Sequence, residues 1–128
     1  MQSEMTSRMS TDMRQCLESC QQCDEMCERM MLQASSLGMS STHLAVMSTC
    51  AQVCRSTADT LRRCAATDGE DGMCRLSMSL CVACADACEA CATRCEQMGG
   101  EQMSDAAAVM RRCASQCRAM TTHNLQPA

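Results

Sequence analysis

The spacing of the sulfur-containing side chains limits the fold of this chain more than any other feature. Cysteine and methionine recur at steps of three or four residues through four segments of the sequence. Such alternating steps place side chains on one face of an α-helix. Each segment therefore predicts a helix with one sulfur-rich stripe facing inward. The stripes contain all 15 cysteines, which are Cys16, Cys20, Cys23, Cys27, Cys50, Cys54, Cys64, Cys74, Cys81, Cys84, Cys88, Cys91, Cys95, Cys113 and Cys117.

Glycines mark the breaks between these segments, at positions 38, 69, 72, 99 and 100. Glycine is common at turns and directly after helix ends. The predicted helices of a single domain, residues 1–128, cover about 11–36, 41–66, 73–98 and 104–121. Ser40, Ser41 or Thr42 is expected to cap the second helix, and Ser104 the fourth. Four helices with short loops predict an all-α, antiparallel up-down four-helix bundle with a cysteine-lined core.

Composition indicates which residues fill the core and excludes some functions. The chain has 15 methionines but no Trp, Tyr or Phe, so cysteine, methionine and alanine must build the interior. With a net charge of −4, no basic patch and no aromatic side chain to stack on bases, nucleic-acid binding is not expected. No stretch approaches the roughly 20 apolar residues of a membrane span, and no secretory signal is recognisable. We therefore expect no membrane association and a cytosolic location.

Many of the cysteines form pairs four residues apart, and this spacing fits disulfides poorly. The Cys-x-x-x-Cys pairs are 16/20, 23/27, 50/54, 84/88, 91/95 and 113/117. Cβ atoms four residues apart on a helix are roughly 5–6 Å from each other, whereas a disulfide needs about 3.5–4.5 Å. Bridges between helices remain possible, so a disulfide-linked or redox-active helical scaffold stays open as the alternative function.

The same spacing favours a monovalent metal ion. Structural zinc and iron–sulfur sites usually take four cysteines from turns or loops, whereas these cysteines form continuous rows on helices. Two sulfurs on opposite sides of one ion stand about 4.6 Å apart, which side chains at i and i+4 can reach. Soft thiolate and thioether ligands select Cu(I), and one Cu(I) per thiolate neutralises a buried row of charges. The rows therefore predict several Cu(I) ions per chain, bound by the fifteen cysteines.

Methionines and a histidine gather at one end of the predicted bundle. The up-down topology brings the start of the second and fourth helices next to the end of the first and third. The candidate ligands at this mouth are His43, Met47, Met98 and Met103, with Met30 or Met31 and Met39 nearby. Neutral thioether and imidazole ligands can pass Cu(I) inward, but methionine also fills irregular cores, and both interpretations stay open. The methionines at the opposite end, expected to be core filler, are Met5, Met9, Met13 and Met120.

The remaining polar residues form no catalytic pattern. The sequence contains no Ser-His-Asp or Cys-His arrangement and no glycine-rich phosphate loop, so we do not expect an enzyme. Its carboxylates lie off the sulfur stripes, which indicates a solvated face with arginine partners four residues away. Candidate apolar contacts of an oligomer, or of ordinary helix packing, are Leu17, Val46, Val53, Leu76 and Leu80.

The longest cysteine row carries a resemblance to a known family. It reads Cys81-Val-Ala-Cys84-Ala-Asp-Ala-Cys88-Glu-Ala-Cys91-Ala-Thr-Arg-Cys95, and the row from Cys16 to Cys27 follows it in strength. With these rows the chain resembles the bacterial copper storage proteins, in particular their cytosolic branch, over nearly its whole length. The resemblance implies cytosolic Cu(I) storage in four-helix bundles that assemble as a homotetramer, with the fifteen cysteines as ligands. The donor and the acceptor of the copper are unknown.

Overall fold

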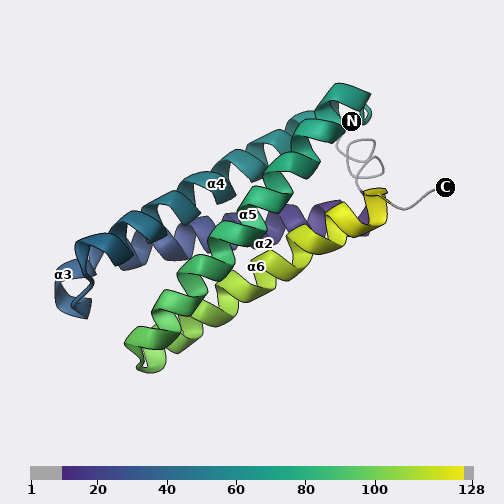
Figure 1. The fold of residues 1–128 in the computed structure, drawn as a ribbon. Helices are drawn as coiled ribbons and strands as arrows, with labels where there is room; N and C mark the ends of the chain where they lie inside the picture. The colour runs from purple at the N-terminus through teal and green to yellow at the C-terminus, as the bar shows by residue number, and fades with distance from the viewer. Residues whose placement is uncertain (1–9, 126–128) are drawn as a thin grey trace.

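The computed structural model describes residues 10–125, and within them the chain is helical without any strand. Its helices are α2 (Thr11–Leu32), the short α3 (Ala34–Leu37), α4 (Ser41–Ala66), α5 (Asp71–Met98) and α6 (Glu101–Leu125). The four long helices run alternately up and down, and each packs against two neighbours in the cyclic order α2, α4, α5, α6 (Figure 1). The predicted all-α four-helix bundle is confirmed.

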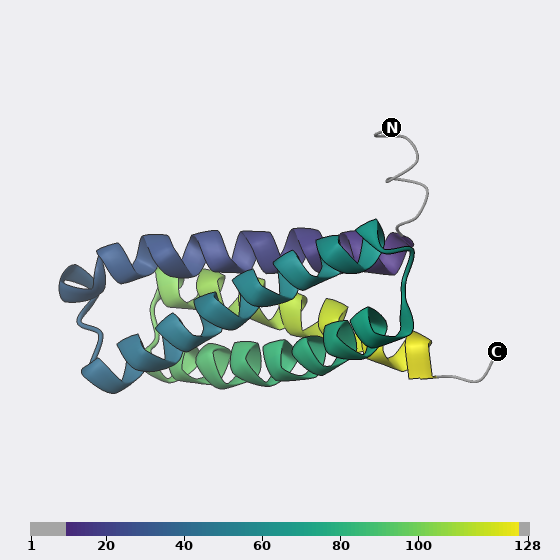
Figure 2. The ribbon, with the colours of Figure 1, turned by 90° about the horizontal axis from the view of Figure 1, so that it is seen from above.

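The two ends of the bundle bring together different segments. The start of α2, the loop of residues 67–70 and the end of α6 meet at one end, which we call the α4–α5 end (Figure 2). Helix α3 and the turn of residues 99–100 lie at the other end, which we call the α5–α6 end. The predicted methionine mouth falls at the α5–α6 end. Met5 and Met9, predicted for the opposite end, lie outside the described residues.

The helices begin and end where capping groups allow. Ser40 Oγ accepts a hydrogen bond from the backbone N–H of His43 at 3.1 Å, so Ser40 is the cap of α4. Helix α5 begins at Asp71, two residues before the predicted start, because the Glu70 side chain caps it by accepting from the Met73 N–H. The predicted cap at Ser104 is wrong. Its N–H donates to the Gly100 carbonyl at 2.9 Å, because α6 already begins directly after the glycine pair.

One predicted helix is divided in the structure. Residues 11–36 were expected to form a continuous helix, but α2 ends at Leu32 and α3 follows after Gln33. The N–H of Gln33 donates to the Met30 carbonyl at 3.0 Å, a tighter turn than that of an α-helix. Gly38 then ends α3 in the left-handed conformation, at φ 72°. The fourth predicted helix is longer than expected, because α6 continues to Leu125, beyond the predicted end at residue 121.

Sulfur-containing and small side chains fill the bundle core. Fourteen cysteines are buried and Cys74 is half-buried. The largest fully buried side chains are Met47, Leu61 and Met110. Buried alanines of α4, α5 and α6, such as Ala51, stand between the cysteines and let the helices approach closely. The core therefore consists of thiols and methyl groups, as the lack of aromatic residues requires.

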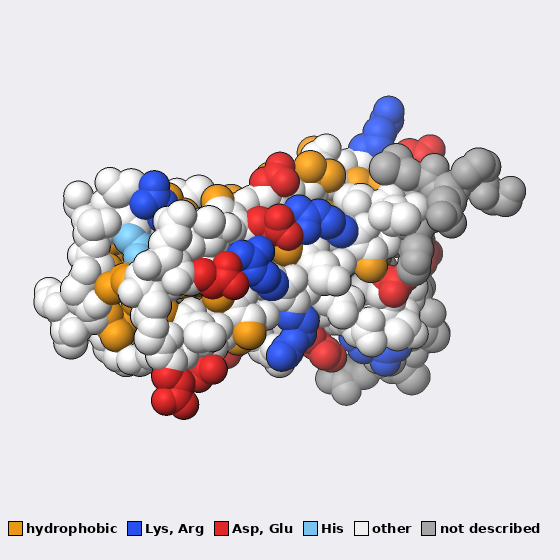
Figure 3. Space-filling view, turned by 60° about the horizontal axis from the view of Figure 1, so that its bottom comes forward, with side chains coloured by type: hydrophobic (Ala, Val, Ile, Leu, Met, Phe, Trp, Pro, Cys, Tyr) orange, Lys and Arg blue, Asp and Glu red, His pale blue; other side chains and the backbone are white. Residues whose placement is uncertain are grey.

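Charged side chains cover the outside of the bundle, and most of the described ion pairs join neighbouring helices. Arg55 Nη2 lies 3.4 Å from Asp24 Oδ1 and 3.3 Å from Glu28 Oε1, which links α4 to α2. The pairs between α6 and α5 are Arg111 with Glu96 and Arg118 with Glu89. Figure 3 shows acidic and basic side chains next to one another across one face. The predicted partners four residues away are wrong for these pairs, because the long arginine side chains span the groove between helices.

Helix α5 differs from the others in its apolar character. It is long and apolar enough to cross a membrane by length and composition alone, a test that the core helix of a bundle also passes, whereas no apolar stretch of this length was expected from the sequence. Its cysteines and alanines count as apolar, yet Cys81, Cys84 and Cys88 face the bundle interior. The same helix also places Leu76 and Val82 on the surface.

Candidate metal centre

Thirteen of the fifteen cysteines form one continuous column along the bundle axis. Within it, Cys16 Sγ lies 3.9 Å from Cys81 Sγ and 3.7 Å from Cys117 Sγ, so three helices meet at one layer. Further in, Cys54 Sγ lies 3.6 Å from Cys84 Sγ. The other sulfur contacts of 3.7–4.0 Å between helices are 20/84, 20/113, 20/117, 23/50, 23/88, 50/88, 54/88 and 84/113.

These sulfurs form overlapping groups that can each hold a metal ion. The groups with all ligand atoms within 4.8 Å are 20/84/113/117, 23/50/54/88, 54/84/88/113 and 16/81/117. Five cysteines each belong to two groups, which are Cys54, Cys84, Cys88, Cys113 and Cys117. A metal ion in one group therefore shares ligands with the next, which is the arrangement of a cluster with bridging thiolates.

Sequence spacing predicted part of this arrangement. The pairs 50/54, 84/88, 91/95 and 113/117 each fall within a group whose ligand atoms are at most 4.8 Å apart, close to the roughly 4.6 Å of a two-coordinate ion. The pairs 16/20 and 23/27 share no such group. Sulfurs of these two pairs in α2 also contact sulfurs of other helices, such as Cys16 with Cys81 and Cys23 with Cys50, a feature that spacing along one helix cannot reveal.

Neighbouring thiols in the column affect each other's protonation. The hydrogen bond with Cys117 lowers the pKa of Cys113, whereas the hydrogen bond with Cys113 raises the pKa of Cys117. All fifteen cysteines are free thiols in the structure. Because a metal ion binds the thiolate, loading of the column must release protons.

His43 joins the column at the α5–α6 end. Its side chain is only 4% exposed, and its Nε2 atom lies 3.5 Å from Cys95 Sγ. With Cys91 and Cys95 it forms a group of three ligand atoms within 4.8 Å of one another. The hydrogen bond with Cys91 lowers the pKa of Cys95 to about 6, against the effect of burial and with a further contribution from His43. This group is the outermost of the column at the α5–α6 end.

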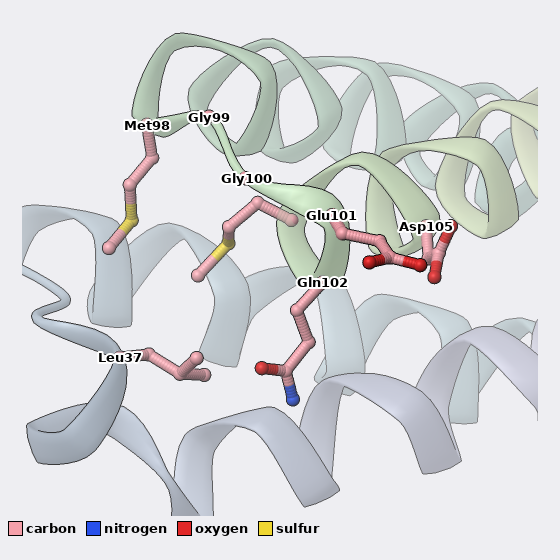
Figure 4. Close-up of a pocket in the computed structure, with 8 residues that line it drawn as sticks. Leu37, Met98, Gly99, Gly100, Glu101, Gln102 and Asp105 are labelled. Carbon is pink, nitrogen blue, oxygen red and sulfur yellow. The ribbon is translucent and has the colours of Figure 1, made fainter.

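The predicted methionine ligands lie at the same end but differ in exposure. Met47 and Met103 are buried, whereas Met98 is 37% exposed. A cavity of about 620 Å³ opens here, lined by Leu37, Met98, Gly99, Gly100, Glu101, Gln102, Met103 and Asp105. In Figure 4, Met98 and Leu37 lie on one side of this cavity, while the carboxylates of Glu101 and Asp105 lie together on the other side. The sequence did not indicate that these two carboxylates line the cavity, although Glu101 begins α6 directly after the glycine pair and Asp105 follows one turn later.

Three of the fifteen predicted cysteine ligands lie outside the groups of three or more. Cys27 is buried, and hydrogen bonds with Cys23 and then Cys50 raise its pKa, which places it beside the 23/50/54/88 group. Cys64 and Cys74 contact each other at the α4–α5 end, with their sulfurs 3.9 Å apart. The structure thus places the predicted ligands in a column and a separate pair.

Comparisons with known proteins agree with this geometry. The family model described as copper storage protein matches residues 2–122. A crystal structure of a protein from Nitrosospira multiformis is 30% identical, with a TM-score of 0.70, and the match covers 88% of this chain and 96% of that one. The Cu(I)-bound copper storage protein BsCsp3 is 28% identical, with a TM-score of 0.57, over 87% of this chain and 99% of that one. No curated protein matches the chain.

Proposed function

This chain belongs to the copper storage protein family, and we propose that it stores several Cu(I) ions on the thiolates inside its four-helix bundle. The observation that carries the proposal is the column of thirteen core cysteines with overlapping sulfur groups. A relative of the same fold, BsCsp3, is Cu(I)-bound. The fifteen cysteines are the proposed ligands.

The charge of the buried column selects the metal. Several thiolates without a cation would be strongly unfavourable in an interior that excludes water. One Cu(I) per thiolate leaves the column neutral, whereas a divalent ion with four thiolates leaves a net charge of −2 at each site. Two- or three-coordinate Cu(I) also fits groups in which sulfurs are shared between neighbouring sites. Thiolate and thioether ligands select Cu(I) among common metal ions.

Anaerobic titration of the reduced protein with Cu(I), in competition with a chromogenic chelator, tests the proposal. We expect many tight equivalents per chain before the chelator binds copper. Saturation at one or two equivalents would contradict storage. A thiol count on unreduced protein tests the disulfide scaffold in parallel. Close to the 15 thiols of the sequence are expected for storage, whereas about one would remain in a fully bridged scaffold.

The α5–α6 end is the proposed mouth for copper uptake. Met98 is exposed there, Met47 and Met103 lie further in, and His43 contacts Cys95 at the end of the column. The carboxylates of the mouth, from Glu101 and Asp105, add negative charge that attracts a cation. Neutral thioether and imidazole ligands bind Cu(I) less strongly than thiolates do, so an ion moves on to the column.

Variants of the mouth are expected to slow loading without reducing capacity greatly. In His43→Leu combined with Met98→Leu, the outer ligands are lost while the column stays intact. We expect the rate of Cu(I) uptake from a chelator complex to fall several-fold and the final capacity to fall by at most about one ion. Stopped-flow absorbance of the chelator measures both. Met110→Leu, a change in the buried core of α6 away from the mouth, is the matched control and should load at the wild-type rate.

We further propose that the protein is cytosolic and assembles as a homotetramer. Leu76 and Val82 of α5 are 57% and 51% exposed, and Val46 lines an apolar groove between α4 and α5. Val82 lines a second groove, between α5 and α6, and a second copy is the proposed occupant of the exposed face of α5 between the two grooves. Sedimentation of the wild type is expected to give about four times the 13.9 kDa chain mass. Leu76→Glu with Val82→Glu should lower that mass, and an unchanged mass would contradict the use of this face.

A further inference from the structure

The cysteine pair at the α4–α5 end is built differently from the column. Cys64 ends the sulfur stripe of α4, and Cys74 begins that of α5, with a sulfur–sulfur distance of 3.9 Å. The loop between them forms hydrogen bonds with both residues. The N–H of Gly69 donates to the Cys64 carbonyl at 2.9 Å, and the carbonyl of Gly69 accepts from the Cys74 thiol at 3.1 Å. Gly69 has φ 70°, a left-handed conformation that other residues rarely adopt.

A layer without thiols separates this pair from the column. On α5, Ser77 stands between Cys74 and Cys81, which are seven residues or roughly 10 Å apart along the helix. On α4, Leu61 stands between the pair and the column and is fully buried. One turn beyond the outermost group of the column, 16/81/117, α2 contributes Met13 and α6 contributes Met120. The Oγ atom of Ser77 is buried and has no hydrogen-bond partner among the described residues.

The pair is also more accessible than the column. The thirteen cysteines of the column are 0% exposed, whereas Cys74 is half-buried and lies in the first turn of its helix. Solvent and dissolved ligands therefore reach its sulfur without opening the bundle. The carboxylates of Asp71 and Glu70 act electrostatically on Cys74 and favour a cation at this end.

We propose that Cys64 and Cys74 form a separate, labile Cu(I) site that exchanges its ion directly with soft ligands in solution. The inference rests on the proposed storage function and adds a second point of exchange, at the end opposite the methionine mouth. Cu(I) replaces the two thiol protons, which pass to water, and lies between the two sulfurs. An incoming thiolate adds to the ion as a third ligand, and one cysteine then leaves and regains a proton. No electron is transferred in these steps.

The separation has a chemical consequence for the two populations of copper. An ion in the column is held by sulfurs shared between sites. It reaches solvent only by moving from site to site to the methionine mouth, or when the helices open locally, which costs free energy. An ion on the pair has two ligands, one of them open to solvent, and the fully buried Leu61 and the buried Ser77, neither of which carries a sulfur, separate it from the nearest column thiols of α4 and α5. The pair therefore fills and empties independently of the column.

Rapid removal of copper from the loaded full-length protein tests this inference. The protein is saturated anaerobically with Cu(I), its copper content is measured, and it is mixed with excess bathocuproine disulfonate in a stopped-flow instrument. For the wild type we expect a fast phase of about one Cu(I) per chain, roughly tenfold or more faster than the rest. In Cys64→Ser combined with Cys74→Ser the fast phase is lost and the slow phases stay unchanged. In Cys23→Ser combined with Cys50→Ser, the matched control within the column, the fast phase remains and the slow amplitude falls.

The outcomes separate this inference from the storage function. A fully loaded wild type without a fast phase, or a fast phase that survives in the Cys64/Cys74 variant, overturns the separate site alone. A chain that binds no copper before mixing overturns storage itself. Ser77→Cys gives an independent check, because a thiol in the separating layer links the pair to Cys81. Its fast phase should slow toward the rates of the column, and an unchanged fast phase would also overturn the inference.

Discussion

Anaerobic loading of the apo-protein with Cu(I) is expected to raise its unfolding temperature by roughly 20 °C or more. A ligand that binds only the folded chain stabilises it by about 4 kcal/mol per site when its concentration is 1,000 times the dissociation constant. Two such sites already add about 8 kcal/mol, and each kcal/mol raises the unfolding temperature of a domain of this size by about 2–8 °C. The overlapping groups of the column offer more than two sites.

The unfolding temperature of the apo-bundle, from which this shift is measured, is expected to be low. Its core consists of thiols, methionines and alanines, without any aromatic side chain. These groups bury less apolar surface than leucine or phenylalanine and therefore contribute less to folding. Copper ions that join sulfurs of different helices, such as those of Cys20, Cys84 and Cys113, act as cross-links in the folded state only.

Differential scanning calorimetry or circular dichroism at increasing Cu(I) per chain measures this shift. The unfolding temperature should rise stepwise as the column fills. The same concentration of Zn(II) should raise it much less, because a divalent ion leaves the thiolate column negatively charged. An unfolding temperature that does not change with Cu(I) would contradict binding inside the bundle and place the copper on the surface.

The second large effect is expected from a single substitution at the centre of the column. Cys84 Sγ lies 3.9 Å from Cys20 Sγ, 3.6 Å from Cys54 Sγ and 4.0 Å from Cys113 Sγ. It belongs to two of the four-sulfur groups. Cys84→Ala is therefore expected to lower the capacity by two or more Cu(I) per chain, since both groups lose a shared ligand.

Cys27→Ala provides the matched comparison. Cys27 and Cys84 are both 0% exposed, and each substitution removes one buried thiol. Cys27 belongs to none of the groups of three or more ligands, so its loss should lower the capacity by at most one Cu(I). Both apo-variants should lose on the order of 1 kcal/mol of stability from the small cavity. Titration with Cu(I) measures the two capacities, and equal losses would contradict shared ligands in the column.

The sequence predicted the fold well because each helix carries its own signal. The steps of three and four between sulfurs define an inward face, and glycines end the helices at residues 38 and 99. The cap at Ser40 was predictable because its hydrogen bond involves residues only three apart. The break at Gln33 and the cap by Glu70 were missed, because several residues near each helix end could begin or end the helix.

The candidate site was predicted less completely. The cysteines were recognisable as ligands, and four of the pairs at i and i+4 fall within potential metal groups. The sequence did not show that Cys16 meets Cys81 and Cys117, because those residues are 65 and 101 positions away. The sequence also did not show that the sulfurs of Cys64 and Cys74 contact each other, because the two residues lie on different helices.

By itself, the sequence determined that thiols face inward on four helices, and that a monovalent soft ion suits them. Both conclusions follow from local geometry and charge, because a side chain at i+3 or i+4 shares the face of residue i whatever the helix packs against. Only the tertiary structure decided which sulfurs meet. The rotation and the lengthwise position of each helix set the distances between helices, and neither is fixed by spacing within one helix. Those two quantities join thirteen cysteines into a column and bring the sulfur of Cys64 next to that of Cys74.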